Sequence, residues 1–148
     1  MPEKETLERA EEDKREGKAA STQAGEFVRE EIEHVREGKH GARSAKQAIA
    51  IGLSKARRAG VNLPPPEKGQ ASKGTREQAS RDVKKGRKAA KKKPSAKRSR
   101  ATLGALKREG RSAASKKALS RHARSAAAKR SKASRSRSAK KAAQTRKK

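Results

Sequence analysis

The 148-residue sequence contains no cysteine, tryptophan or tyrosine, one methionine and one phenylalanine. Without cysteine, the chain can form neither disulfides nor thiolate metal sites, and its redox compartment is not indicated. With Phe27 as the single aromatic ring, it lacks the stacking platforms on which proteins bind single strands or flipped bases.

Large apolar residues are also scarce, with fifteen Met, Leu, Ile, Val and Phe in the whole chain. Burying one such side chain contributes roughly 1.5–3 kcal/mol, whereas ordering each residue costs roughly 1–2 kcal/mol of backbone entropy. The sequence therefore predicts a mostly α-helical and largely disordered protein. No run of eighteen apolar residues and no signal-peptide pattern occurs, so a cytoplasmic protein is expected.

Charge is abundant and unevenly distributed, with a formal net charge of +28. Residues 1–37 carry 7 Lys/Arg and 12 Asp/Glu, residues 38–63 carry 6 and none, and residues 64–148 carry 31 and 4. We expect an acidic helical arm over residues 1–20, exposed because its helix holds only one large apolar residue, Leu7. The remaining expected regions are a helical hairpin over 21–63, a Pro/Gly linker over 64–74 and a basic tail over 75–148 with helices near 99–109 and 113–130.

Two amphipathic segments predict the hairpin. Apolar residues recur at helical spacing over about residues 22–37 and again over 45–59. A short Gly-containing connection joins the segments, and "VNLPPP" ends the second. Gly52 and nearby alanines are expected to let the two helices approach closely. The predicted hairpin core consists of Val28, Ile32, Val35, Ile49 and Leu53, and Ile51 on the opposite side indicates a possible homodimer.

The hairpin also carries a family resemblance. The segment "SAKQAIAIGLSKARRAGV" (residues 44–61), together with "GEFVREEIEHVREGKHGARS" before it and "LPPPEKG" after it, resembles an uncharacterised bacterial family of small basic proteins with a KQAIAIxLSxARxAG motif. The resemblance spans about residues 25–68 and implies a bacterial source and a compact helical module, without an established activity. Some members of that family are labelled DNA-binding or plasmid-stabilisation proteins. The composition of the tail resembles linker-histone tails and bacterial histone-like Lys/Ala-rich tails.

No motif indicates catalysis or metal binding. The histidines form no HExxH pair and are expected to make a poor metal site. The three are His34, His40 and His122. The glutamates within residues 30–37 are expected on an exposed helix face, paired with Arg29, Arg36 or the basic flank of the second hairpin helix. We therefore expect neither an enzyme nor a cofactor, metal or small-molecule substrate.

Phosphate neutralisation by lysine and arginine is the function that the composition favours. The predicted nucleic-acid-binding residues are Arg43, Lys46, Arg57, Arg58, Lys84, Lys85, Arg87, Lys88, Lys91, Lys92, Lys93, Lys97, Arg98, Arg100, Arg121, Arg124, Lys129, Arg130, Arg135, Arg137, Lys140 and Lys141.

The preferred interpretation is a histone-like, sequence-nonspecific DNA-coating or condensing protein of the bacterial nucleoid. One alternative is an RNA- or ribosome-associated protein or RNA chaperone, since electrostatics do not distinguish the two nucleic acids. Another is a plasmid-maintenance protein whose hairpin binds a protein partner. Membrane binding is not favoured, because the tail lacks the Leu, Phe and Trp face of an interfacial helix.

Overall fold

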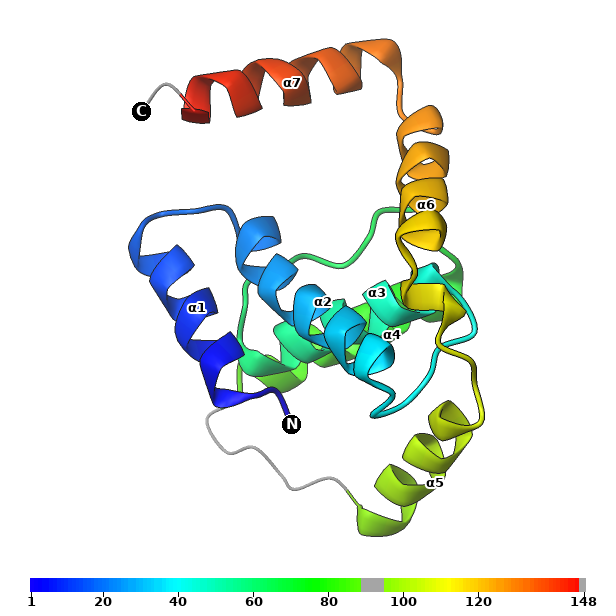
Figure 1. The fold of residues 1–148 in the computed structure, drawn as a ribbon. Helices are drawn as coiled ribbons and strands as arrows, with labels where there is room; N and C mark the ends of the chain where they lie inside the picture. Colours follow the sequence, from blue (N-terminus) through cyan, green and yellow to red (C-terminus); the bar gives the residue numbers. More distant parts are fainter. Residues whose placement is uncertain (89–94, 147–148) are drawn as a thin grey trace.

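The computed structural model describes residues 1–88 and 95–146, and most of these residues are helical (Figure 1). No strand occurs in these residues. The elements are α1 (Lys4–Arg15), α2 (Ala20–Glu37), α3 (Ala45–Ala59), α4 (Lys73–Gly86), α5 (Ala96–Lys107), a 3₁₀ turn (Ser112–Ala114), α6 (Lys116–Ala128) and α7 (Lys132–Arg146).

The expected helical class is right, but the expectation of a largely disordered chain is wrong. In its described residues, the region after residue 64 contains four helices and a 3₁₀ turn, where only two helices were predicted. Alanine, lysine and arginine are among the best helix formers. Ser72 and Ser115 also cap α4 and α6 by accepting hydrogen bonds from the backbone N–H groups of Thr75 and Ala118. The basic tail is thus a series of helices.

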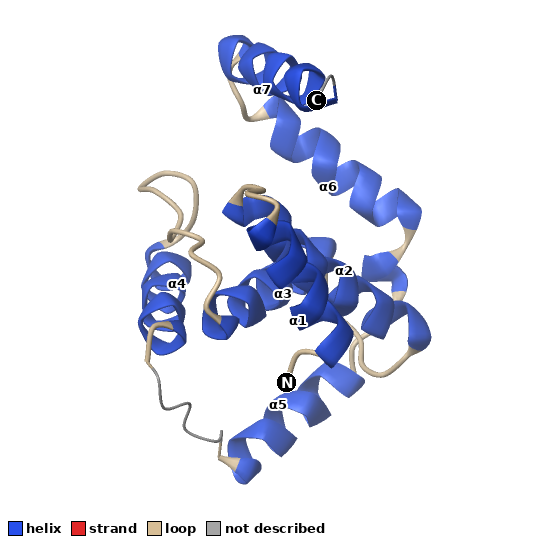
Figure 2. Ribbon diagram, turned by 90° about the vertical axis from the view of Figure 1, so that its left-hand side faces the viewer, coloured by secondary structure: helices blue, strands red, loops and turns tan. Residues whose placement is uncertain are grey.

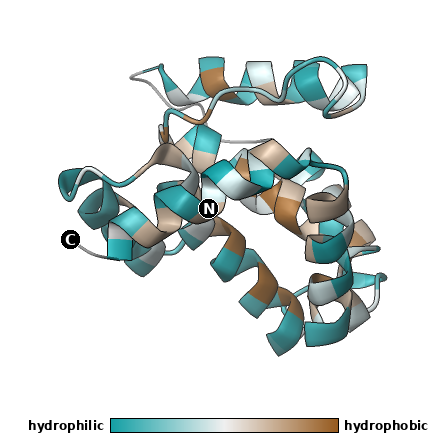
Figure 3. Ribbon diagram, turned by 90° about the horizontal axis from the view of Figure 1, so that it is seen from above, coloured by the Kyte–Doolittle hydropathy of each residue, from teal (hydrophilic) through white to brown (hydrophobic). Residues whose placement is uncertain are grey.

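The core lies between α2 and α3, and it is made mostly of alanine. Nine of the twelve buried apolar residues are alanines, and the other three are Phe27, Ile32 and Val35. Figure 3 agrees with this, because few positions of the ribbon are brown (hydrophobic) among the teal (hydrophilic) ones. An alanine core provides burial only where helix backbones approach closely, so counting large side chains alone underestimates the packing of this chain.

The predicted hairpin core is confirmed for Ile32 and Val35, which are buried. Val28 and Leu53 are partly buried and pack against separate clusters, Val28 beside Ile32 and Leu53 beside Phe27. Ile49 was predicted in the core and Ile51 on the opposite, exposed side of the helix. Both are half-buried, so this predicted contrast is not found.

The acidic arm is not an exposed helix. α1 packs along α2 (Figure 1), with Thr6, Ala10 and Asp13 buried. Arg9 also donates from Nε to Glu26 Oε2 on α2 at 2.7 Å. The helix α1 therefore packs on α2 through small and polar side chains, because it lacks a stripe of large apolar residues.

The helix α4, which the apolar pattern did not predict, docks on α3 through a buried carboxylate. Asp82 is 1% exposed and accepts hydrogen bonds from Ser54 Oγ at 2.7 Å, Arg58 Nε at 2.7 Å and Gln78 Nε2 at 3.0 Å. A hydrogen-bonded charge of this kind can replace apolar contact between helices.

The chain after α5 returns to the hairpin. Gly41 and Ala42 donate backbone hydrogen bonds to the carbonyls of Leu106 and Gly110, at 2.9 and 3.0 Å. The 3₁₀ turn then inserts Ala113 and Ala114 into the cluster of Ile32 and Val35. A hairpin of 99–130 alone would bury too few leucines to be stable, but this segment is stabilised by the core of residues 21–63.

The predicted close approach of α2 and α3 is confirmed at Gly52, and it gives a test. A Cβ at Gly52 would lie 2.6 Å from Val28 Cα and 2.9 Å from Phe27 O. We expect Gly52→Ala to lower the free energy of unfolding by about 1–3 kcal/mol in urea denaturation, because backbone atoms must separate. Gly25→Ala on α2, where a Cβ meets nothing within 4 Å, should instead raise stability by roughly 0.5–1 kcal/mol. Equal effects of the two substitutions would contradict this packing.

Candidate nucleic-acid interface

The helices α5, α6 and α7 contain four, four and six Lys/Arg residues and no acidic residue. Neither α5 nor α6 has a buried residue. In Figures 1 and 2, α5 and α7 lie at opposite ends of the molecule, and α6 leads from the core toward α7. Cationic helices therefore project from two sides of a body that holds most of the acidic residues.

Most of the predicted binding residues are exposed. They are Arg43, Lys46, Arg58, Lys84, Lys85, Arg87, Lys88, Lys97, Arg98, Arg100, Arg121, Arg124, Lys129, Arg130, Arg135, Arg137, Lys140 and Lys141. Lys91, Lys92 and Lys93 lie outside the described residues. The structure does not bring the exposed set onto a single face, since it is distributed over α3 to α7.

Arg58 and Arg43 belong to this exposed set and make ion pairs. The Arg58 guanidinium binds Asp82, and Arg43 Nε lies 3.6 Å from Glu109 Oε1. These two side chains are already partly neutralised by carboxylates of their own chain.

Arg57 was predicted to contact phosphate, but its side chain is not available for that role. It is 7% exposed and donates from Nε to Leu63 O and from Nη2 to Pro64 O, both at 3.2 Å. Burial lowers its pKa from the ordinary value, although the nearby Asp82 acts in the opposite direction. Arg57 holds the segment after α3 against the helix.

A basic depression that sequence reasoning missed lies where α2 meets the start of α6. It is lined by Arg36, Arg111, Ser112, Ala114, Ser115 and Lys116. Arg36 Nε donates to Ala114 O at 3.0 Å, across 78 residues of sequence. No sequence pattern joins these positions, because only the return of the tail to the hairpin brings them together.

A buried charge cluster lies between α2 and α3. Glu30 is 2% and Glu31 0% exposed, and Lys55 Nζ lies 3.0 Å from Glu30 Oε1 and 2.7 Å from Glu31 Oε2. Burial acts to raise the pKa of Glu30, but the Glu3 N–H and Lys55 outweigh it and the pKa is lowered. Burial acts to lower the pKa of Lys55, but Glu31 and Glu30 raise it. The expected exposed face for these two glutamates is therefore wrong.

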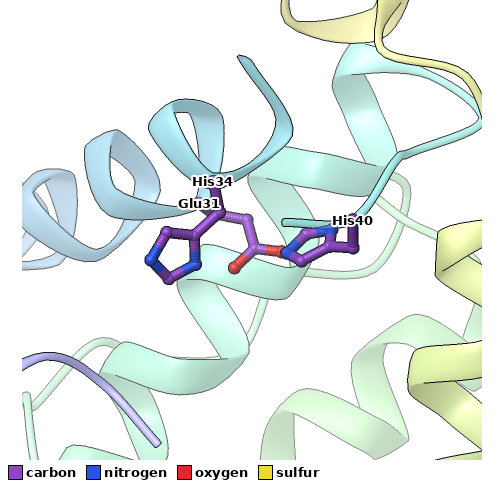
Figure 4. A group of neighbouring side chains, drawn as sticks. All are labelled: Glu31, His34 and His40. Carbon is purple, nitrogen blue, oxygen red and sulfur yellow. The ribbon is translucent and has the colours of Figure 1, made fainter. Parts of the chain in front are cut away.

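Among the described residues, one group of side chains has the composition and proximity to ligate a metal ion. It consists of Glu31, His34 and His40, whose ligand atoms lie within 4.8 Å of one another (Figure 4). Sequence reasoning discounted the histidines because they flank a turn. The Glu31-x-x-His34 spacing was a usable signal, since residues three apart share a helix face.

The fold and surface define a small, basic, all-helical module with a cationic extension. Residues 11–68 match a family described as "Family of unknown function (DUF6496)". This match covers α2, α3 and the latter part of α1, and it starts earlier than the resemblance predicted from residues 25–68. No curated protein and no solved structure matches the chain.

None of the helices in residues 1–88 and 95–146 combines the length and the apolar character that crossing a bilayer requires.

Proposed function

We propose that this protein binds nucleic acid without sequence specificity, by neutralising phosphates with the exposed cations of α5, α6 and α7, and that duplex DNA is its main partner. The observation that carries the proposal is the absence of any acidic side chain from these three helices. These helices therefore carry positive charge alone, whereas α1 and α2 hold most of the carboxylates of the chain.

The arrangement suits phosphate contact better than base readout. α7 carries cations at 132, 135, 137, 140, 141 and 146, which point to different sides of a helix with 3.6 residues per turn. Base recognition relies on Asn, Gln or Arg at fixed positions of one helix held in the major groove. The helix α7 contains one glutamine, no asparagine and three arginines, and the arginines, at 135, 137 and 146, do not all lie on one helix face. On this proposal the protein coats or condenses bacterial DNA and acts at the nucleoid without catalysing a reaction.

The test is a salt titration of binding to a duplex DNA and to a structured RNA of equal length. Each neutralised phosphate of B-DNA contributes about −0.9 to the slope of log K against log salt. A full-length variant with Lys132, Arg135, Arg137 and Lys140 all changed to Gln should lose about 3–4 units of that slope.

The matched control also removes four positive charges, but from the helices α1 and α2. It changes Lys4, Lys14, Arg15 and Arg29, which are also exposed. Its slope should stay within about one unit of the wild-type value. If both variants lose slope equally, net charge alone drives binding and the assignment to α7 is wrong. Tighter binding to RNA than to DNA at every salt concentration would replace DNA by RNA as the partner.

A further inference from the structure

We infer that Glu31, His34 and His40 form a binding site for a divalent transition-metal ion, with Zn²⁺ the best fit. All three side chains are nearly buried, with 1%, 13% and 10% of their side-chain surface exposed. Two imidazoles and one carboxylate are a recognised zinc ligand set that leaves a fourth position open. The site lies on α2 and on the turn that follows it (Figure 4).

The outer nitrogen of each ring is already held by an acceptor. His34 Nε2 lies 2.9 Å from Glu3 Oε1, and His40 Nδ1 lies 3.1 Å from Gly41 O. Glu3 Oε1 also accepts from Lys39 Nζ at 3.0 Å, and a carboxylate in an ion pair with an ammonium group only accepts. A carbonyl oxygen also only accepts. Both outer nitrogens must therefore carry the proton.

This fixes the tautomer of each neutral imidazole. The lone pair then belongs to Nδ1 of His34 and to Nε2 of His40. Figure 4 shows the inner nitrogen of each ring turned toward the Glu31 carboxylate, and His40 Nε2 lies 3.2 Å from Glu31 Oε1. In the neutral form of both rings, two lone pairs and a buried carboxylate oxygen face one another, and a cation between them would stabilise this arrangement.

Glu31 itself lacks the hydrogen bonds that a buried carboxylate needs. Both of its oxygens are buried without a hydrogen-bonding partner, although Lys55 Nζ makes an ion pair with Oε2 at 2.7 Å. Lys55 thus occupies the Oε2 side, and Oε1 faces the histidines. Metal-binding histidines usually donate their other N–H to a carboxylate or a backbone carbonyl, which is the arrangement that Glu3 and Gly41 provide.

A metal ion here would tie three parts of the fold together. The group joins Glu3, which precedes α1, to α2 and to the turn containing Gly41, whose N–H binds the returning tail at Leu106. The inference does not depend on the proposed nucleic-acid function, because none of these three ligands belongs to the cationic helices.

The test uses Co²⁺ as a spectroscopic probe and Zn²⁺ as a competitor, on the full-length protein without a histidine tag. We expect one equivalent of Co²⁺ to give d–d absorption between about 500 and 650 nm, typical of a four-coordinate site, and Zn²⁺ to abolish it. His34→Gln and His40→Gln should each weaken binding at least tenfold. His122→Gln, which changes the third histidine on α6, is the matched control and should bind as the wild type does.

The far-UV circular dichroism of each variant is compared with that of the wild type, and the wild-type titration alone decides the question if a variant unfolds. No visible band at one equivalent of Co²⁺ would overturn the inference. So would an equal loss of affinity in His122→Gln, because the ion would then bind at scattered surface histidines. Zn²⁺ should also raise the melting temperature of the wild type and leave that of His40→Gln unchanged.

Discussion

Lys55→Met should lower the free energy of unfolding by about 3–5 kcal/mol, the usual cost of removing one partner from a buried ion pair. The Lys55 ammonium contacts Glu30 and Glu31, whose side chains are 2% and 1% exposed, and is itself only 23% exposed. Methionine keeps most of the length of the side chain, so the loss arises from two buried carboxylates without a counter-ion. Urea denaturation followed by circular dichroism, in the presence of a chelator, measures the effect.

Lys46→Met is the matched control, since Lys46 lies on the same helix and is exposed. Surface substitutions of this kind change stability by about 0.5 kcal/mol or less. A second check adds Glu31→Gln to Lys55→Met, which removes one buried charge and should recover part of the lost stability. If Lys55→Met and Lys46→Met change the free energy of unfolding equally, water solvates the two glutamates in place of Lys55. The buried cluster then does not stabilise the fold.

The helices with an apolar stripe could be predicted from the sequence, and α3 was predicted with its observed bounds. Its ends are specified locally, by the Ser44 hydroxyl that accepts from Gln47 N and by Gly60 in the left-handed conformation. By contrast, α4 and α7 lack such a stripe. Their existence depends on alanine, lysine and arginine propensity and, for α4, on the polar contacts of Asp82.

The candidate sites required information that local pattern does not contain. A glutamate on a helix is usually exposed, and the burial of Glu30 depends on hydrogen bonds from Lys55, 25 residues later, and from the backbone N–H of Glu3. The spacing of Glu31 and His34 was visible in the sequence, but His40 reaches them only through the turn after α2. The exposed cations were the easiest to predict, because most lysine and arginine side chains are exposed. Arg57 is the exception, since its side chain is buried.

The contact between the hairpin and the returning tail provides the second strong test. A Cβ at Gly41 would lie 1.9 Å from Glu109 O and 2.8 Å from Gly110 O, and neither backbone oxygen can rotate away. Overpacking commonly costs about 1–3 kcal/mol, and an overlap with rigid backbone falls at the upper end of that range. We expect Gly41→Ala to release residues 106–114 from α2 and the turn after it, while α2 and α3 remain packed.

Amide hydrogen exchange measures this local release. A loss of about 3 kcal/mol corresponds to exchange roughly a hundredfold faster in the released segment, and trypsin should cut sooner after Arg108 and Arg111. Gly104→Ala on α5 is the matched control, because a Cβ there meets nothing within 4 Å, and it should leave exchange in residues 106–114 unchanged. Uniformly faster exchange in Gly41→Ala, α2 and α3 included, would mean that tail and hairpin unfold as one unit. Unchanged exchange would mean that the tail does not dock at Gly41, and the two backbone hydrogen bonds to Leu106 and Gly110 would then not hold it in solution.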